Sequence, residues 1–277
     1  MSGVRSSRSE LWLGRIVLAM LVVFTLLPFI GMLSAALQPA GSNPVGIQIP
    51  ANPQWGNFIT AFEMSKLPTL MTSSLILVLM VVPAGLALAT AAAYGIVVLR
   101  VPYGGAAFLV LLLGLTIPFE SLIVPLYHLM KDGGLLNTRL AIALPLIALY
   151  LPFGVFWMRA HFMGVPKELT EAAEMDGAGW WKGLRLIHLP LAKPALTTLL
   201  VLYSLWTWNQ FMIALVMMDE PLMRTVAGAL GAFQGQYGTD IVLLSAGALL
   251  IMLPTILVFA IFQKQFVVAL LQGSVKG

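Results

Sequence analysis

Six long apolar stretches constrain the fold of this chain more than any other feature of its sequence. They run over residues 15–37, 69–99, 105–130, 138–160, 194–218 and 239–263. A helix needs about 20 residues to cross the hydrocarbon core of a bilayer, so each stretch is long enough for one span. The apolar residues are continuous and do not alternate with polar ones, which argues against membrane-spanning strands. The sequence therefore predicts an all-α polytopic membrane protein with six transmembrane helices.

The composition indicates a membrane environment for the whole chain. Only 9% of its 277 residues are charged and 60% are hydrophobic, so a single globule could not present a polar enough surface to water. The first apolar stretch is longer than the core of a cleavable signal peptide, which spans about 7 to 15 residues, so we expect it to be a retained span. We expect residues 1–277 to form a single transmembrane domain.

The distribution of basic residues predicts how the spans are oriented. With the amino terminus in the cytoplasm, most of the 15 Lys and Arg residues fall on the cytoplasmic side, as the positive-inside rule requires. That set is Arg5, Arg8, Arg15, Arg100, Arg159, Lys167, Lys182, Arg185, Lys193, Lys264 and Lys276. Only Lys66, Lys131, Arg139 and Arg224 fall on the opposite side. Six spans then return the carboxyl terminus to the cytoplasm, so both termini are expected there.

Several classes of chemistry have no signal in the sequence. The chain has no cysteine, which excludes disulfides and cysteine nucleophiles. It also has no G-x-x-x-x-G-K-[ST] phosphate loop, no zinc-binding helix motif and no G-x-S-x-G elbow. We therefore expect no catalytic residue, no metal site and no enzyme activity. The net charge of +4 is small and dispersed, so no nucleic-acid partner is expected, and we expect His188 to be a residue of the cytoplasmic surface.

One polar stretch, "EAAEMDGAGWWKGLRLIHLP" at residues 171–190, interrupts the apolar pattern within a loop placed at 161–193. Pro166 suits a first helical position, and Gly177 suits the left-handed residue that ends a helix. Trp180 and Leu184 then begin a second apolar face. The pattern predicts two short helices joined by a turn over residues 166–190. Such a hairpin either docks on a partner protein or lies among lipid headgroups, and periodicity alone does not separate these alternatives.

The same stretch resembles the signature loop of bacterial ABC-importer permeases, which reads "EAA", then "DGA" and, after a spacer, "I-x-LP". The matching residues are Glu171, Ala172, Ala173, Asp176, Gly177, Ala178, Ile187, Leu189 and Pro190. The segments "LPFGVFWMRAHFMGVPKEL", "WNQF", "FQGQYGTD" and "GSVKG" resemble the carbohydrate-type branch, in particular the second permease subunit of maltose-type sugar importers. The resemblance covers most of the chain from about residue 70 onward. It departs at "GSVKG", which replaces the more usual "GAVKG", and at Gln210, where many relatives carry Glu.

The resemblance implies a membrane permease subunit of a sugar importer in the bacterial inner membrane. The loop would be a coupling helix that docks on a cytoplasmic ATPase, and the tail would reach into the ATPase dimer. That tail comprises Gly273, Ser274, Val275, Lys276 and Gly277. The implied partners are a second permease subunit, two ATPase subunits, an extracytoplasmic solute-binding protein, the sugar and membrane lipids. ATP and Mg would be bound by the ATPase, so no cofactor is expected in this chain.

Three polar residues within the apolar stretches are candidates for the substrate pathway. Glu120 is an acid near the middle of the third stretch, where a charge is costly unless it is paired or hydrated, so we expect it to face the interior of the bundle. Pro118 and Pro125 flank it and predict a kink. Asn209 and Gln210 follow two tryptophans in the fifth stretch, a combination that suits sugar binding. The alternative for all three is a structural hydrogen bond between helices.

A second class of function is a secondary transporter or channel subunit for a small polar solute. Such a protein is expected to carry ionisable residues in several spans, or broken helices in paired halves. This sequence has one acid near mid-span and no internal repeat. The sequence therefore favours the ABC permease over this alternative.

Overall fold

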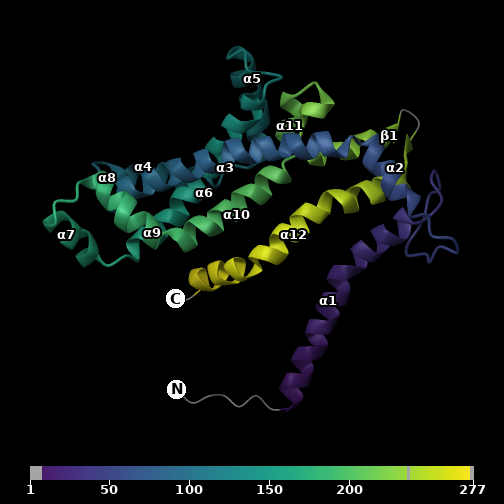
Figure 1. The fold of residues 1–277 in the computed structure, drawn as a ribbon, viewed down its shortest axis with the longest axis horizontal. Helices are drawn as coiled ribbons and strands as arrows, with labels where there is room; N and C mark the ends of the chain where they lie inside the picture. Colours follow the sequence, from purple (N-terminus) through teal and green to yellow (C-terminus); the bar gives the residue numbers. More distant parts are fainter. Residues whose placement is uncertain (1–7, 236–237, 275–277) are drawn as a thin grey trace. The chain divides into compact units, whose positions relative to one another are not determined.

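The computed structural model describes residues 8–235 and 238–274 of the chain, and four long helices dominate it (Figure 1). These are α1 Arg8–Ala36, α3 Leu67–Val97, α6 Arg139–Met163 and α12 Ile241–Ser274. Each contains a segment long and apolar enough to cross a membrane. Two bent pairs of shorter helices raise the number of possible spans in the described residues to six.

The chain divides into two compact units, each with its own core. The first comprises residues 1–67 and 230–253, and the second comprises residues 68–229 and 254–277. The second unit contains the second to fifth predicted stretches and the polar loop. It therefore holds most of the candidate functional residues.

In the first unit, α2 Gly56–Met64 is fastened to the end of α1 by a buried amide. The Nδ2 of Asn57 donates hydrogen bonds of 2.8 Å to the backbone carbonyls of both Ala36 and Gln38. A two-residue antiparallel pair, β1 Gln234–Gly235 and β2 Gly238–Thr239, precedes α12. Phe233 packs so close to α12 that a Cβ on Gly247 would lie 2.5 Å from its ring.

The third predicted stretch is divided in the structure. It forms α4 Gly104–Gly114, the 3₁₀ turn η1 Phe119–Leu122 and α5 Ile123–Asp132, with a bend of 97° at the break. Pro118 explains the break, because it has no backbone N–H and disfavours helical geometry in the residue before it. The kink predicted from this proline is thus present, as a sharp bend between two helices.

The fifth predicted stretch is divided too, into α10 Lys193–Trp208 and α11 Met212–Met217. At the break, the side chain of Asn209 donates to the carbonyl of Leu205 at 2.9 Å, and Gln210 Oε1 accepts from the N–H of Ile213 at 3.2 Å. Amide side chains that bond to nearby backbone in this way compete with helix continuation. The chain then passes through η3 Pro221–Met223 and η4 Val226–Phe233 before it reaches α12.

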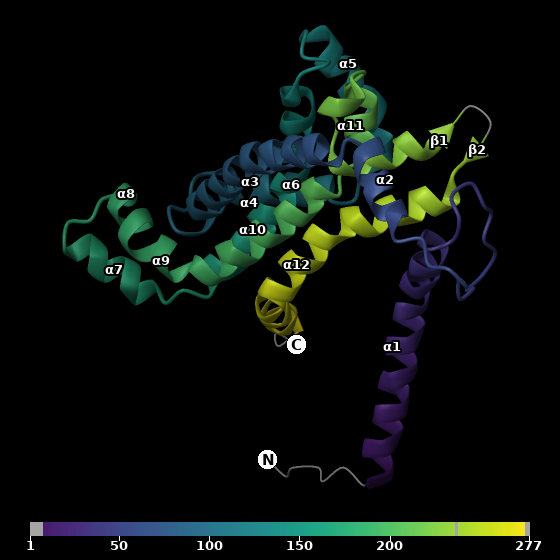
Figure 2. The ribbon, with the colours of Figure 1, turned by 45° about the vertical axis from the view of Figure 1, so that its right-hand side comes forward.

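The core of the second unit consists of two apolar clusters. One joins α3, α4, α6 and α10 around the buried Tyr203, and the other joins α3, α5, α6 and α11 around Leu77, Ile142 and Ile213. Figures 1 and 2 both show α3, α6 and α10 side by side. The polar loop folds at one end of this packed group of helices.

Candidate functional site

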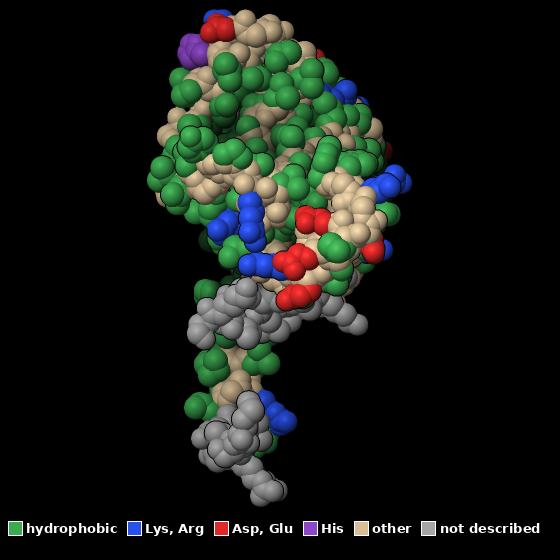
Figure 3. Space-filling model, turned by 90° about the vertical axis from the view of Figure 1, so that its left-hand side faces the viewer, with side chains coloured by type: hydrophobic (Ala, Val, Ile, Leu, Met, Phe, Trp, Pro, Cys, Tyr) green, Lys and Arg blue, Asp and Glu red, His purple; other side chains and the backbone are tan. Residues whose placement is uncertain are grey.

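The polar loop forms a helical hairpin, as the sequence predicted. Its first arm is α7 Lys167–Met175. Its second arm is continuous through α8 Trp180–Gly183, the π-helical turn η2 Leu184–His188 and α9 Leu189–Leu191, and it leads into α10 with a bend of 76°. Figure 3 looks onto the end of the second unit that carries α7 and α8, where acidic and basic side chains gather.

Gly177 makes the turn between the two arms. Its φ of +74° lies in the left-handed region, which residues with a Cβ rarely occupy. The N–H of Ala178 donates to the carbonyl of Ala173 at 2.9 Å, and the N–H of Gly177 donates to the carbonyl of Glu174 at 3.0 Å. This pair of bonds is a Schellman motif, which satisfies carbonyls at the end of α7. The direction of the second arm therefore depends on Gly177.

His188 joins the two arms and also contacts the neighbouring helices. Its Nε2 lies 3.2 Å from the Oγ1 of Thr170 on α7. Its ring makes edge contacts with Tyr94 of α3 and Phe162 of α6, with centroids 5.2 and 5.7 Å away. The side chain is 1% exposed, so the expected surface position of His188 is wrong. Burial lowers the pKa of this imidazole, and the nearby His161 lowers it further; both effects favour the neutral ring.

A second connection fastens the hairpin to α3. The hydroxyl of Tyr94 donates a hydrogen bond of 3.0 Å to the backbone carbonyl of Trp180 at the start of α8. Leu184, one turn later, is buried in the same cluster as Tyr94 and Phe162. Tyr94 and Phe162 belong to long helices, so the hairpin is in direct contact with both α3 and α6.

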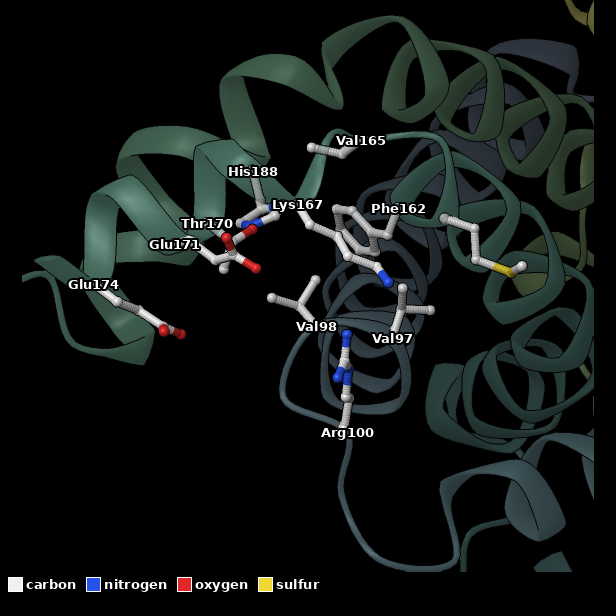
Figure 4. Close-up of a pocket in the computed structure, with 11 residues that line it drawn as sticks. Val97, Val98, Arg100, Phe162, Val165, Lys167, Thr170, Glu171, Glu174 and His188 are labelled. Carbon is white, nitrogen blue, oxygen red and sulfur yellow. The ribbon is translucent and has the colours of Figure 1, made fainter.

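A cavity of about 380 Å³ lies between the hairpin and the ends of α3 and α6 (Figure 4). Apolar side chains from α3 and α6 form one wall. The charged side chains that line it are Arg100, Lys167, Glu171 and Glu174. Arg100 lies in the turn between α3 and α4, whereas the other three lie along one face of α7. The cavity thus combines an apolar wall with two cations and two carboxylates.

The predicted coupling residues divide between the surface and the interior of the hairpin. Glu171, Ala172, Asp176, Gly177 and Pro190 are exposed, Ala178, Ile187 and Leu189 are half-buried, and Ala173 is buried. Trp180 and Trp181 are exposed and contact each other edge to face. The hairpin therefore presents small, acidic and aromatic side chains on a surface that the described part of the chain leaves uncovered.

The candidate pathway residues lie at the two helix breaks. Glu120 lies in η1 and is exposed. The described helices of this chain therefore do not bury it, although we expected it to face the interior of the bundle. Asn209 and Gln210 lie between α10 and α11, and Gln210 also accepts a hydrogen bond at its carbonyl from Thr225. Among the described residues, no hydrogen bond joins Glu120 to either amide.

The predicted tail is only partly within the described structure. Helix α12 extends to Ser274, so Gly273 and Ser274 are its last two residues. Val275, Lys276 and Gly277 lie outside the described residues.

Sequence comparison identifies the family. Residues 59–270 match the family described as "Binding-protein-dependent transport system inner membrane component". The chain belongs to this family. It is therefore an inner-membrane permease subunit of an ABC importer that works with a solute-binding protein, and it is not itself an enzyme. The alternative of a secondary transporter or channel is not supported.

Individual relatives agree with this assignment. The chain is 30% identical over 252 residues to the melibiose/raffinose/stachyose import permease protein MelC of Bacillus subtilis, with 91% of each chain covered. It is 31% identical over 271 residues to the arabinooligosaccharides transport system permease protein AraQ of Halalkalibacterium halodurans, with 96% of each covered. A chain of a bacterial ABC transporter that imports alginate matches with a TM-score of 0.78 at 20% identity, covering 94% of this chain and 98% of that one. The predicted all-α permease fold is confirmed.

The sequence alone did not reveal several residues of this site. Tyr94 and Arg100 are separated from the hairpin by α4, α5 and α6, and only the folded chain brings them to it. Phe162 lies near the end of α6, just before the hairpin, but its contact with His188 on the second arm also forms only in the folded chain. The one signal that pointed to Arg100 was the predicted topology, which placed it on the same side of the membrane as the hairpin.

Proposed function

We propose that this permease subunit imports a sugar and is driven by a cytoplasmic ATPase that docks on the α7–α9 hairpin. The observation that carries the proposal is the hairpin itself. Its outer surface is uncovered, its turn is fixed by Gly177, and its inner side is attached to two long helices through His188 and Tyr94. A partner that binds the outer surface can therefore move α3 and α6 through these contacts.

Relatives of this chain are named for oligosaccharides, which supports a carbohydrate as the substrate. Glu120 and Asn209 are proposed to face the pathway. Both are exposed on this chain. Residues that line a pathway between two permease subunits are expected to be exposed on each subunit alone. Gln210 is proposed to have a structural role, because its side chain caps α11.

The proposed assembly contains a second permease subunit and two ATPase subunits, which bind ATP and Mg. The positive-inside rule supports an orientation with the hairpin and both termini in the cytoplasm. In that orientation the tail Gly273–Gly277 lies on the same side as the ATPase, and we propose that it also contacts the ATPase dimer.

The experiment is to purify the complex from membranes, identify its subunits and reconstitute it in proteoliposomes with the solute-binding protein. Uptake of a labelled oligosaccharide should require ATP on the hairpin side and should stop when a non-hydrolysable analogue replaces ATP. Uptake that follows an ion gradient without ATP would contradict the proposal. Transport of a non-carbohydrate solute alone would contradict the sugar assignment and leave the ATPase assignment intact.

A further inference from the structure

The cavity beneath the hairpin lies where two spans end. Val97 is the last residue of α3 and Met163 is the last residue of α6, and both line the cavity. Both helices are long and apolar enough to cross a membrane. Tyr103, in the adjacent turn between α3 and α4, is 88% exposed, and exposed aromatic residues of this kind are typical of the membrane–water interface. The cavity thus lies at the ends of two candidate spans, beside an exposed aromatic residue.

The charged side chains of the cavity are not paired with one another. In Figure 4, Arg100 and Lys167 extend toward the same space beside Val97 and Val98, and Glu171 lies next to Thr170. Within the described parts of the chain, no carboxylate oxygen comes within 4.0 Å of a Lys or Arg nitrogen here. Two cations and two carboxylates therefore line one cavity without neutralising each other directly.

A buried polar atom at the same place also lacks a partner. The ring of His188 lines the cavity and is almost fully buried, and its Nδ1 makes no hydrogen bond to any described residue. Buried polar atoms in folded proteins nearly always have a partner, either protein or a bound molecule. This nitrogen belongs to a residue that lines the cavity, and its missing partner is an observation separate from the surface charges.

We propose that the cavity binds the headgroup of an aminophospholipid, a phosphodiester that carries a primary ammonium group. Arg100 and Lys167 bind the phosphate through charge-assisted hydrogen bonds, and Glu171 accepts hydrogen bonds from the ammonium. The apolar wall formed by Val97 and Met163 continues toward the acyl chains. The volume of about 380 Å³ falls within the range of small-molecule sites.

The mixed charge of the cavity selects this headgroup over others. Basic pockets at the ends of spans attract anionic lipids in general, but the two carboxylates disfavour a headgroup that has only negative charge. A quaternary ammonium has no N–H to donate to Glu171. The preferred ligand therefore carries both a phosphate and a primary amine, and it bridges the α3–α4 turn and α7.

The inference does not depend on which solute is transported. The experiment uses the purified transporter complex, titrated with phosphatidylethanolamine, phosphatidylcholine or phosphatidylglycerol and analysed by native mass spectrometry. Wild type is expected to retain phosphatidylethanolamine in preference to the other two. In the double variant Arg100→Gln/Lys167→Gln, retention should fall by about tenfold, since hydrogen bonds to charged groups are the strong ones.

Two further variants make the result specific. Glu171→Ala should remove the preference for phosphatidylethanolamine over phosphatidylcholine while phosphate binding remains, because it leaves no side-chain acceptor for the ammonium. Arg185→Gln is the matched control, because Arg185 is an exposed cation of the hairpin that does not line the cavity, and its retention should equal that of wild type. Size-exclusion profiles verify that all variants are folded and assembled.

Several outcomes would overturn the proposal. Equal retention of the three lipids by wild type would show that there is no headgroup site. An equal loss in Arg185→Gln would show a general effect of surface charge. If soluble phosphoethanolamine displaces the bound lipid and no lipid is preferred, the ligand is a free phosphate compound. If bound ATPase prevents all three lipids from binding, the partner protein fills the cavity.

Discussion

The hydroxyl of Tyr203 on α10 donates a hydrogen bond of 2.7 Å to the backbone carbonyl of Tyr150 on α6. The bond is possible because Gly154 has no side chain. A Cβ at this glycine would lie 2.0 Å from the Tyr203 oxygen and 2.8 Å from the Cβ of Ala89 on α3. Three helices thus meet at one glycine and one tyrosine.

Gly154→Ala should therefore destabilise the helix packing, by about 1 to 3 kcal/mol for an overpacked core. Thermal unfolding of the purified complex in detergent measures the effect. Gly105→Ala in α4 is the control, because a Cβ there meets nothing within 4 Å. It should not lower the unfolding temperature, and the higher helix propensity of Ala favours a small increase. Equal effects of the two substitutions would contradict the close packing at Gly154.

Tyr94→Phe removes the hydrogen bond between α3 and the carbonyl of Trp180 but keeps the ring that packs on His188. A net hydrogen bond contributes about 1 kcal/mol, or roughly a fivefold change in an equilibrium. We expect the ATPase to bind normally while the uptake per ATP hydrolysed falls by that order. Paired measurements of uptake and hydrolysis in proteoliposomes test this.

The control for Tyr94→Phe is Tyr103→Phe, which removes a hydroxyl from an exposed residue at the same end of the spans. It should leave the ratio of uptake to hydrolysis unchanged. A normal ratio in Tyr94→Phe as well would mean that the hairpin acts on the bundle by another contact.

The sequence predicted the hairpin well because its determinants are local. Gly177 as a left-handed stop and the spacing of the signature loop follow from residues close together in the chain. The attachment of the hairpin could not be predicted in the same way. Tyr94 and Trp180 are 86 positions apart, and nothing in either local pattern indicates the partner. The burial of His188 was missed for the same reason, since its cover comes from α3 and α6.

The helix breaks show an intermediate case. Pro118 is a local signal, so the kink in the third stretch was predicted. The break after Trp208 contains no proline, and it depends on the amide side chains of Asn209 and Gln210 bonding to backbone. A prediction from hydrophobicity alone therefore treats α10 and α11 as one span.

Gln210→Ala should lower the stability of the complex by about 1 kcal/mol, the usual cost of losing a helix cap. Gln210→Glu retains an acceptor for the N–H of Ile213 and should be close to wild type in thermal unfolding. Asn209→Ala should change the apparent affinity for sugar more than the stability. If Gln210→Ala instead altered affinity with no loss of stability, Gln210 would belong to the pathway.

Glu120→Leu tests the other pathway candidate. Because Glu120 is exposed in η1 and makes no hydrogen bond to another described side chain, the substitution should preserve insertion and assembly. Uptake should decrease or its apparent affinity should change, and Glu120→Gln, which keeps polar hydrogen bonding, should have the smaller effect. Unaltered rate and affinity in both variants would assign Glu120 no part in transport.

Gly177→Asp is expected to uncouple ATP hydrolysis from uptake while the protein remains inserted. The substitution places a Cβ at a φ of +74°, and left-handed geometry costs a non-glycine residue about 1 to 2 kcal/mol. The Schellman bonds of Ala178 and Gly177 would then be strained, and the second arm would leave α7 in another direction.

Gly179→Asp is the matched control, since it adds the same charge two residues away at a φ of −66°, in open space. Loss of coupling only in Gly177→Asp assigns the effect to the turn. Equal loss in both variants would assign it to negative charge at the docking surface, and normal uptake in Gly177→Asp with the ATPase still bound would show that the angle between the two arms does not control transport.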